Sequence, residues 1–260
     1  MAEHPLLKIS NLTKRFGGLA AVNDVSVTFE AGKINAIIGP NGAGKTTFFN
    51  LVAGAMPPTS GSIEFNGMDV TGMAPDRIAR LGIARTFQTT KLFEQSTVLD
   101  NLIVGHRLRT QSRLWDVIIN SKRLRDEEKK CRARAEEVLD FVGLSHLGNR
   151  YILDISQEER KRVAFALAMA TDPELVLLDE PAGGINPEET ENLAALIRKM
   201  VSHGISVCLI EHKMDMIMSL ADKIMVLDHG EKIAEGTPEQ IKNDPVVIEA
   251  YLGSDEDVEA

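Results

Sequence analysis

Short apolar runs recur along the chain and are separated by segments with a different periodicity. The runs INAII (34–38), LVLL (175–178) and SVCLI (206–210) have the length and composition of strands that are buried on both faces. From Val163 onward, such runs alternate with helix-like segments. This alternation predicts a mainly parallel sheet that is covered by helices.

Two earlier parts of the chain have other patterns. From Leu6 to Val70, short strand-like segments separated by glycine or proline predict a small, mostly antiparallel layer. Between about residues 97 and 148, the sequence is strongly charged and its apolar positions, such as Val138 and Val142, recur at helical spacing. We therefore expect an α/β protein with an inserted helical segment.

Composition narrows the class of protein. The chain has 260 residues, of which 43% are hydrophobic, so it can bury a substantial core. Its apolar runs are much shorter than the roughly 20 residues that cross a bilayer, and its N-terminus does not have the pattern of a secretory signal. The formal charge of −9 disfavours a nucleic-acid partner. Cys131 and Cys208 stand outside any CxxC or zinc-ligand pattern, and we expect a cytoplasmic protein without disulfides.

A glycine-rich loop after the first apolar run carries the strongest chemical signal. The segment GPNGAGKTT fits the pattern G-x-x-x-x-G-K-[ST], with a strand before it and a helix after it. Its backbone N–H groups and the helix N-terminus can cradle phosphates, while Lys45 reaches the β and γ phosphates and Thr46 binds Mg²⁺. The predicted nucleotide-binding residues are Gly39, Pro40, Asn41, Gly42, Ala43, Gly44, Lys45, Thr46 and Thr47.

Two acids follow the run at 175–178. Asp179 would stand at the carboxyl end of a strand, where a carboxylate can join the Mg²⁺ shell, through water in our interpretation. Glu180 is suited to orient an attacking water and to accept its proton. An acidic pair after a strand is by itself more often a surface turn or a cap, so the phosphate loop upstream is what favours this interpretation.

Further residues resemble the motifs of ABC-transporter ATPases, in the same order along the chain. Phe16 resembles the aromatic residue that stacks on adenine, and Gln88 the glutamine that contacts Mg²⁺ and senses the membrane partner. Residues 182–187, AGGINP, resemble the loop that crosses to a second ATPase, although Asn186 replaces the usual aspartate. His212 resembles the histidine at the γ phosphate. The resemblance implies ATP and Mg²⁺ as cofactors and Lys45, Glu180 and His212 as catalytic residues.

The resemblance extends along the chain and is most specific to the ATPases of branched-chain amino acid importers. It rests on RIARLGIARTFQ, the charged insert, LLDEPAGGINPEET, LIEHKMD and the ending GTPEQIKNDPVVIEAYLG. It implies an ATP-hydrolysing subunit on the cytoplasmic face of the membrane, which closes as a hetero- or homodimer with a second ABC ATPase. Two membrane permease subunits and, indirectly, an extracytoplasmic solute-binding protein complete such a transporter.

One motif departs from the family pattern. The family signature L-S-G-G-Q, at which a serine and a glycine face the ATP of the partner subunit, corresponds here to ISQEE, so that Ser156 is retained and Glu158 replaces a glycine. The same stretch is S-x-x-E, a capping box that predicts a helix start at Ser156. We therefore expect a well-capped helix and a weakened contact with the partner-bound ATP.

These observations predict a P-loop NTPase core with an N-terminal antiparallel β subdomain and an inserted helical subdomain. We expect the ATP-binding core in residues 1–91 and 163–260 and the helical subdomain, with the signature region, in residues 92–162. Alternatives remain: an ATPase of an importer for urea, amides or another solute, a soluble ABC-type mechanical ATPase, and a nucleotide kinase. A mechanical ATPase would usually carry tandem ATPase halves or long coiled coils, and neither appears in this sequence. A nucleotide kinase would need an acceptor site and a lid, and it gives no reason for the ordered glutamine, DEP and histidine motifs.

Overall fold

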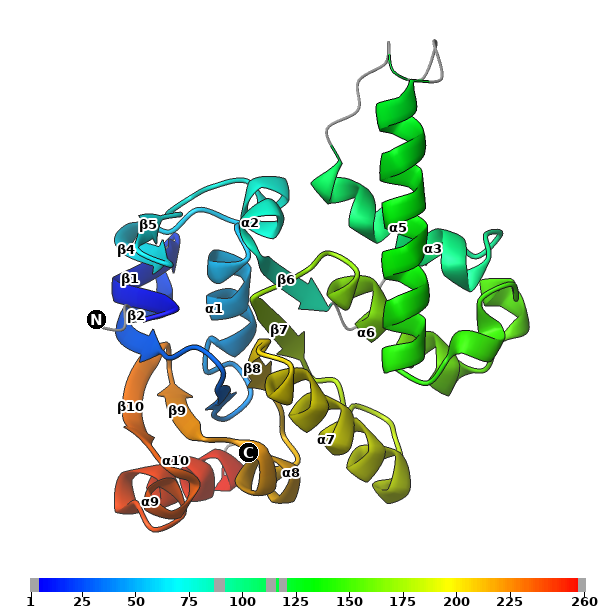
Figure 1. Ribbon diagram of the computed structural model, residues 1–260. Helices are drawn as coiled ribbons and strands as arrows, with labels where there is room; N and C mark the ends of the chain where they lie inside the picture. Colours follow the sequence, from blue (N-terminus) through cyan, green and yellow to red (C-terminus); the bar gives the residue numbers. More distant parts are fainter. Residues whose placement is uncertain (1–4, 87–91, 111–115, 117–120, 257–260) are drawn as a thin grey trace. The chain divides into compact units, whose positions relative to one another are not determined.

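The computed structural model of the protein describes residues 5–86, 92–110, 116 and 121–256 (Figure 1). The chain divides into two compact units. The first comprises residues 1–78 and 177–260, and the second comprises residues 79–176. The functional boundaries that we expect after residues 91 and 162 remain a prediction.

The N-terminal strands of the first unit form an antiparallel sheet. Its strand order is β2-β1-β4-β5, with β1 (Leu7–Phe16), β2 (Leu19–Phe29), β4 (Ser60–Phe65) and β5 (Met68–Asp69). Leu7, Ile9 and Leu12 of β1 are buried, whereas Lys8 between them is exposed. This alternation is what a sheet with one covered face requires, and the predicted antiparallel layer is confirmed.

A second sheet of the first unit carries the buried apolar runs. Its strand order is β10-β9-β3-β8-β7, with β3 (Ile34–Ile38), β7 (Leu175–Asp179), β8 (Ser206–Ile210), β9 (Lys223–Asp228) and β10 (Glu231–Gly236); β7 begins in the second unit. Strand β3 pairs in parallel with both β8 and β9. Among the strand pairs described for this sheet, β10 and β9 are the antiparallel pair. The predicted mainly parallel sheet is confirmed.

Helices complete the first unit. They are α1 (Lys45–Val52), α7 (Pro187–Ser202), α8 (Met214–Leu220), α9 (Pro238–Lys242) and α10 (Pro245–Glu256), while α2 (Pro75–Leu81) runs across the boundary between the units. Helix α7 packs on β8 and α8, and α9 and α10 pack on β10. The backbone N–H of Glu180 donates to the carbonyl of Ile210 at 2.9 Å, so β7 and β8 end at the same edge of the sheet.

The second unit is mostly helical. It contains β6 (Ile83–Thr86), α3 (Val98–His106), α5 (Lys122–Phe141), α6 (Gln157–Met169) and the short 3-10 turns η1 (Arg107–Arg109), η2 (Ser145–Leu147) and η3 (Ile152–Asp154). Helix α3 packs against α5 and α6, and α6 packs against β6. The buried side chains of α5 include Ala135, Val138 and Leu139, which follow the helical spacing expected from the sequence.

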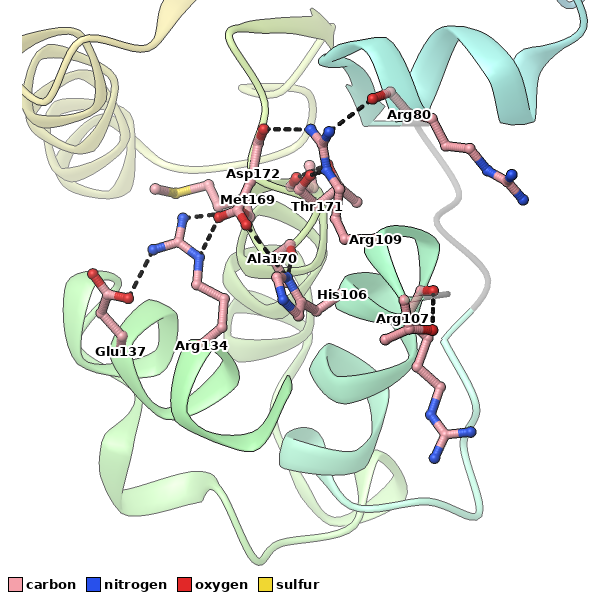
Figure 2. A network of polar contacts seen from close by, with 12 residues as sticks. Arg80, His106, Arg107, Arg109, Arg134, Glu137, Met169, Ala170, Thr171 and Asp172 are labelled. Atoms are coloured by element: carbon pink, nitrogen blue, oxygen red, sulfur yellow. Dashed lines mark hydrogen bonds and ion pairs between the residues drawn. The ribbon is translucent and has the colours of Figure 1, made fainter. Parts of the chain in front are cut away.

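Charged side chains hold the turn after α6 within the second unit (Figure 2). The Arg109 guanidinium donates to the carbonyls of Arg80, Thr171 and Asp172 at 2.7, 2.9 and 2.7 Å. Arg134 Nε lies 2.6 Å from Asp172 Oδ1. Cations at a helix C-terminus bind carbonyls that have no partner within the helix and are favoured there by its dipole. Segments far apart in the sequence are thereby joined at this turn.

Among the described ranges, no helix is both long and apolar enough to cross a bilayer. Cys131 and Cys208 are both free and buried.

Candidate functional site

The glycine-rich loop connects β3 to α1, as the sequence predicts. Gly39 and Gly44 have positive φ angles, of 150° and 98°. A Cβ atom added to Gly39 would lie 1.9 Å from the Leu227 carbonyl oxygen, and one added to Gly44 would lie 2.2 Å from the Ala21 carbonyl oxygen. Side chains are therefore excluded at both positions, and the close approach of backbone to backbone fixes the path of the loop.

Lys45 is the buried cation of this loop. Its side chain turns back over the loop, where Nζ donates to the carbonyls of Gly39 and Pro40 at 2.7 and 2.8 Å. Burial lowers the pKa of Lys45, while the charges of Glu180 and Asp179 act in the opposite direction. The ammonium group thus lies in a partly desolvated position and interacts with both acids that the sequence analysis selected.

The N-terminus of α1 is open to an anion. Gly44 is its N-cap residue, with no side-chain cap, and its first turn contains no acidic residue. The unshared N–H groups at such a helix start carry partial positive charge. Thr46, in this first turn, is exposed. The arrangement suits phosphate oxygens and places a hydroxyl oxygen beside them.

The two acids at the end of β7 differ in environment. Asp179 is only 6% exposed, whereas the Glu180 side chain is 31% exposed. Glu180 also has a φ of 48°, in the left-handed region that residues other than glycine seldom adopt. Strained backbone of this kind is frequent at functional sites. This backbone turn directly follows the buried β7 and lies at the residue that carries the partly exposed carboxylate.

His212 lies beside Glu180. It follows β8, and its Nε2 atom is 3.0 Å from Glu180 Oε1. The structure therefore brings together Lys45, Asp179, Glu180 and His212, which are far apart in the sequence. A cation, a buried carboxylate, an exposed carboxylate and an imidazole at one edge of a sheet form a suitable set for phosphoryl transfer.

Phe16 ends β1 and is 49% exposed, which leaves its ring accessible to a planar ligand. The Nζ atom of Lys14 lies 5.3 Å from the centroid of this ring. Lys14 also donates to the Pro57 carbonyl at 2.7 Å, so this cation is held in place. Gln88 lies outside the described residues, and its expected contact with Mg²⁺ remains a prediction.

The oxygen donors near the phosphate loop suit Mg²⁺, which takes only part of its coordination from protein groups. Among the described residues, no cluster of three or more His, Cys, Asp or Glu side chains could hold a metal ion. Mg²⁺ needs no such cluster, because it usually binds one or two protein oxygens together with phosphate oxygens and waters. Asp179 and Thr46 are oxygen donors of the kind that this coordination uses.

In the second unit, Ser156 begins α6 as the S-x-x-E pattern predicts. Its hydroxyl oxygen accepts from the Glu159 backbone N–H at 3.2 Å, and the Glu159 carboxylate accepts from the Ser156 backbone N–H at 2.7 Å. Glu158 is exposed in the same first turn. Unlike α1, which begins without acids, α6 begins with two carboxylates.

Sequence reasoning missed Glu211 and Lys213, which flank His212. Glu211 is only 4% exposed. The available signal was an acid directly after the strand run SVCLI, which is apolar apart from its serine, so that burial is expected there and a charge is unusual. The contacts of both residues could be known only from the structure, because they reach a loop that is remote in sequence.

Comparisons with known proteins agree with this geometry. The family model described as ABC transporter matches residues 22–183. A second model, described as branched-chain amino acid ATP-binding cassette transporter, matches residues 231–257. The chain is thus similar to this group in its C-terminal segment as well as around the nucleotide motifs.

Relatives and solved structures match nearly the whole chain. The high-affinity branched-chain amino acid transport ATP-binding protein BraF of Pseudomonas aeruginosa is 42% identical over 96% of this chain and 98% of its own length. The corresponding LivG protein of Escherichia coli is 40% identical, with the same coverage. A crystal structure of the ADP conformation of an ATP-binding cassette from an ABC transporter matches with a TM-score of 0.83 and 31% identity, over 96% of this chain and 99% of that one. The predicted fold class is confirmed.

Proposed function

Because the chain belongs to the ABC transporter family of ATP-binding cassettes, we propose that it is the ATP-hydrolysing subunit of an importer for branched-chain amino acids. The observation that carries the ATPase assignment is the contact between His212 and Glu180 at the edge of the sheet where Lys45 and Asp179 also lie. The solute class is supported by the two relatives and by the C-terminal match.

In this proposal each residue acts on bound ATP in a defined way. The N–H groups of residues 39–47 bind the phosphates, and Lys45 exchanges its carbonyl acceptors for the β and γ phosphate oxygens. Phe16 stacks on the adenine. Glu180 orients the attacking water and accepts its proton, and His212 holds the Glu180 carboxylate and contacts the γ phosphate. Mg²⁺, held by Thr46, Asp179 and Gln88, would neutralise charge on the phosphates.

The proposed assembly contains a second ABC ATPase, two membrane permease subunits and an extracytoplasmic binding protein. ATP held between two ATPase subunits shifts their equilibrium toward the closed dimer, and hydrolysis releases that bias. We place the chain at the cytoplasmic face of the membrane as a peripheral subunit. The absence of a spanning helix among the described residues is compatible with that role.

The test is reconstitution of the complete transporter in proteoliposomes. We expect the chain to co-purify with the permease subunits and its ATPase to rise when the binding protein carries leucine, isoleucine or valine. E180Q should reduce kcat by at least about a hundredfold, as loss of a positioned base does. Stimulation by urea or amides alone would reassign the solute, and stimulation by DNA or ribosomes would overturn the transporter assignment.

We further propose that the composite site that contains Ser156 and the ATP of the partner subunit is weak. The signature glycine is replaced by Glu158, and the Ser156 and Glu159 side chains already bond to each other's backbone N–H groups. Two like charges about 4 Å apart near a protein surface repel by about 4 kcal/mol. The neighbouring Arg160 lies 3.9 Å from Glu94 and donates to the Leu153 carbonyl, so it already has partners.

Replacement of Gln157-Glu158-Glu159 by Gly-Gly-Gln in the reconstituted transporter tests this second proposal. We expect a faster ATPase and tighter ATP-driven closure, because a repulsive carboxylate is removed and backbone is exposed to the phosphate. E159Q alone is the matched control, since it keeps an acceptor for the cap and retains Glu158. An unchanged ATPase rate and unchanged closure would refute the idea.

A further inference from the structure

Glu211 is a buried carboxyl group that the proposed reaction does not use. It follows the last residue of β8, directly before His212, and is 4% exposed. Burial of a carboxyl group is costly unless its oxygens find donors. The hydrogen-bond donors to Glu211 therefore show which segments of the chain this side chain connects.

Among the described residues, three backbone N–H groups donate to Glu211. Oε1 accepts from Ala182 at 2.5 Å, and Oε2 accepts from His212 and Lys213 at 2.9 and 3.3 Å. Ala182 belongs to the loop after Glu180, and the other two donors belong to the segment after β8. One side chain thus joins the two segments that carry the proposed catalytic carboxylate and histidine.

Lys213 makes a second connection between the same segments. Its Nζ donates to the Ile185 carbonyl at 2.9 Å and to the Thr190 hydroxyl oxygen at 2.9 Å. The Thr190 hydroxyl in turn donates to the Asn186 carbonyl at 2.8 Å. Glu211 therefore binds the start of the loop, and Lys213 binds its end and the first turn of α7.

The start of the loop contains two glycines, whereas its end is held by the cap of α7: the Asn186 N–H donates to the Glu189 carboxylate at 3.1 Å, and the Asn186 side-chain oxygen accepts from the Glu189 N–H at 2.9 Å. Gly183 and Gly184 are exposed, and Ala182 is the fully buried residue of the loop. A turn closes between the Gly183 N–H and the Glu180 carbonyl at 3.1 Å. Because glycine leaves the backbone free to move, we expect the bonds from Glu211 and Lys213 to add to these local bonds and to fix Ala182 and Ile185 in position.

We propose that Glu211 and Lys213 are positioning residues that make the 182–186 loop and His212 move as one body. The inference rests on the proposed function, in which this loop meets the second ATPase and His212 holds Glu180. A displacement of the loop by the partner subunit then reaches the His212 backbone through the Glu211 carboxylate. The state of the partner thereby controls the alignment of the His212–Glu180 pair.

The test compares E211A, E211Q and K213M with S206A in the full chain assembled with its transporter partners. Ser206 is the matched control: it is buried at the start of β8, and its hydroxyl oxygen accepts from the Gly32 N–H at 2.9 Å, away from the loop. The S206A substitution removes a buried hydrogen-bond acceptor from β8, so its effect on kcat shows what a structural defect alone would cause.

We expect E211A to lower kcat by about tenfold or more while the KM for ATP stays within about twofold, since misplaced catalytic groups reduce rate more than ground-state binding. E211Q, which keeps one acceptor oxygen, should lie between E211A and the original chain, and K213M should lower kcat without loss of folding. S206A should keep kcat. Equal loss of kcat in S206A and E211A, or normal kcat in both E211A and K213M, would overturn the proposal.

Amide hydrogen exchange of the isolated full chain gives a readout that does not require activity. Exchange of residues 181–186 should accelerate in E211A and K213M and stay unchanged in S206A. Unchanged exchange in both variants would contradict the positioning role. H212A and E180Q separate the two proposals: normal ATPase in those variants would refute the proposed function, whereas the exchange result would still decide whether Glu211 holds the loop.

Discussion

Neighbouring carboxylates in the first turn of α6 serve different purposes. Glu159 accepts from the Ser156 backbone N–H and completes the capping box, while Glu158 is exposed one position earlier. Hydrogen bonds from the Ser156 backbone and hydroxyl groups lower the pKa of Glu159. Because the Glu159 carboxylate is hydrogen-bonded to the start of its helix, its contribution to stability depends on pH in a defined way. This dependence distinguishes Glu159 from the exposed Glu158.

The capping box should stabilise the protein least in acid. The pKa of Glu159 is lower in the folded chain than in the unfolded chain, so its contribution is complete above the unfolded value, near 4.5, and is lost as the pH falls through the folded value. We expect E159Q to flatten the loss of stability on acidification, measured by urea unfolding between about pH 3 and 7. E158Q removes the same charge without the Ser156 contacts; an equal effect in both variants would refute this assignment.

Helix α6 is stabilised at both ends by charges of the sign that its dipole favours. Acids occupy the first turn, and the guanidinium groups of Arg109 and Arg134 meet the end, with the His106 ring beside them (Figure 2). His106 Nδ1 lies 3.0 Å from the Ala170 carbonyl oxygen and 3.5 Å from Asp172 Oδ2. Along the chain, this fixed end lies between Ser156, which resembles the family signature serine, and β7, which ends at the proposed catalytic acids.

Arg109 should be the most important side chain of this cluster. R109A removes the donor of three hydrogen bonds to carbonyl groups, so we expect a loss of about 1–2 kcal/mol in unfolding free energy. Arg107, two residues earlier in η1, faces Glu128 at 3.6 Å across an exposed surface, and R107A should cost less than about 0.5 kcal/mol. Urea unfolding measures both variants. A cost for R107A as large as that for R109A would contradict the capping role.

The two ends of α6 also show what a sequence can predict. Ser156 and Glu159 are three residues apart, so a local rule identifies the helix start without knowledge of the fold. Arg109 and Asp172 are 63 residues apart, and nothing in their neighbouring residues indicates that they meet. The phosphate loop and the acids at the end of β7 belong to the first kind of signal, and the contact of Glu211 with Ala182 belongs to the second. Local motifs were predictable, whereas their long-range supports were not.

The described residues of the proposed ATP site are distributed unequally between the two units. The phosphate loop, Phe16, Asp179, Glu180 and His212 lie in the first unit, whereas Ser156 lies in the second. In the proposed site, ATP bound to a single chain would therefore contact the first unit through these residues. In the proposed dimer, Ser156 faces a nucleotide only when another ATPase subunit supplies it.

Nucleotide binding should consequently slow hydrogen exchange in the first unit of the monomer, and in the second unit only when the partner ATPase is present. At about a hundred times its Kd, Mg-ATP should stabilise the monomeric chain by about 2.7 kcal/mol, and removal of Mg²⁺ or the K45A substitution should abolish most of this gain in thermal unfolding. Hydrogen exchange should slow at residues 39–47 in the monomer, because the phosphates cover these N–H groups. Residues 156–159 should gain protection only when the partner ATPase is present. Protection of residues 156–159 in a monomer would refute the division, since Ser156 would then contact its own chain's nucleotide.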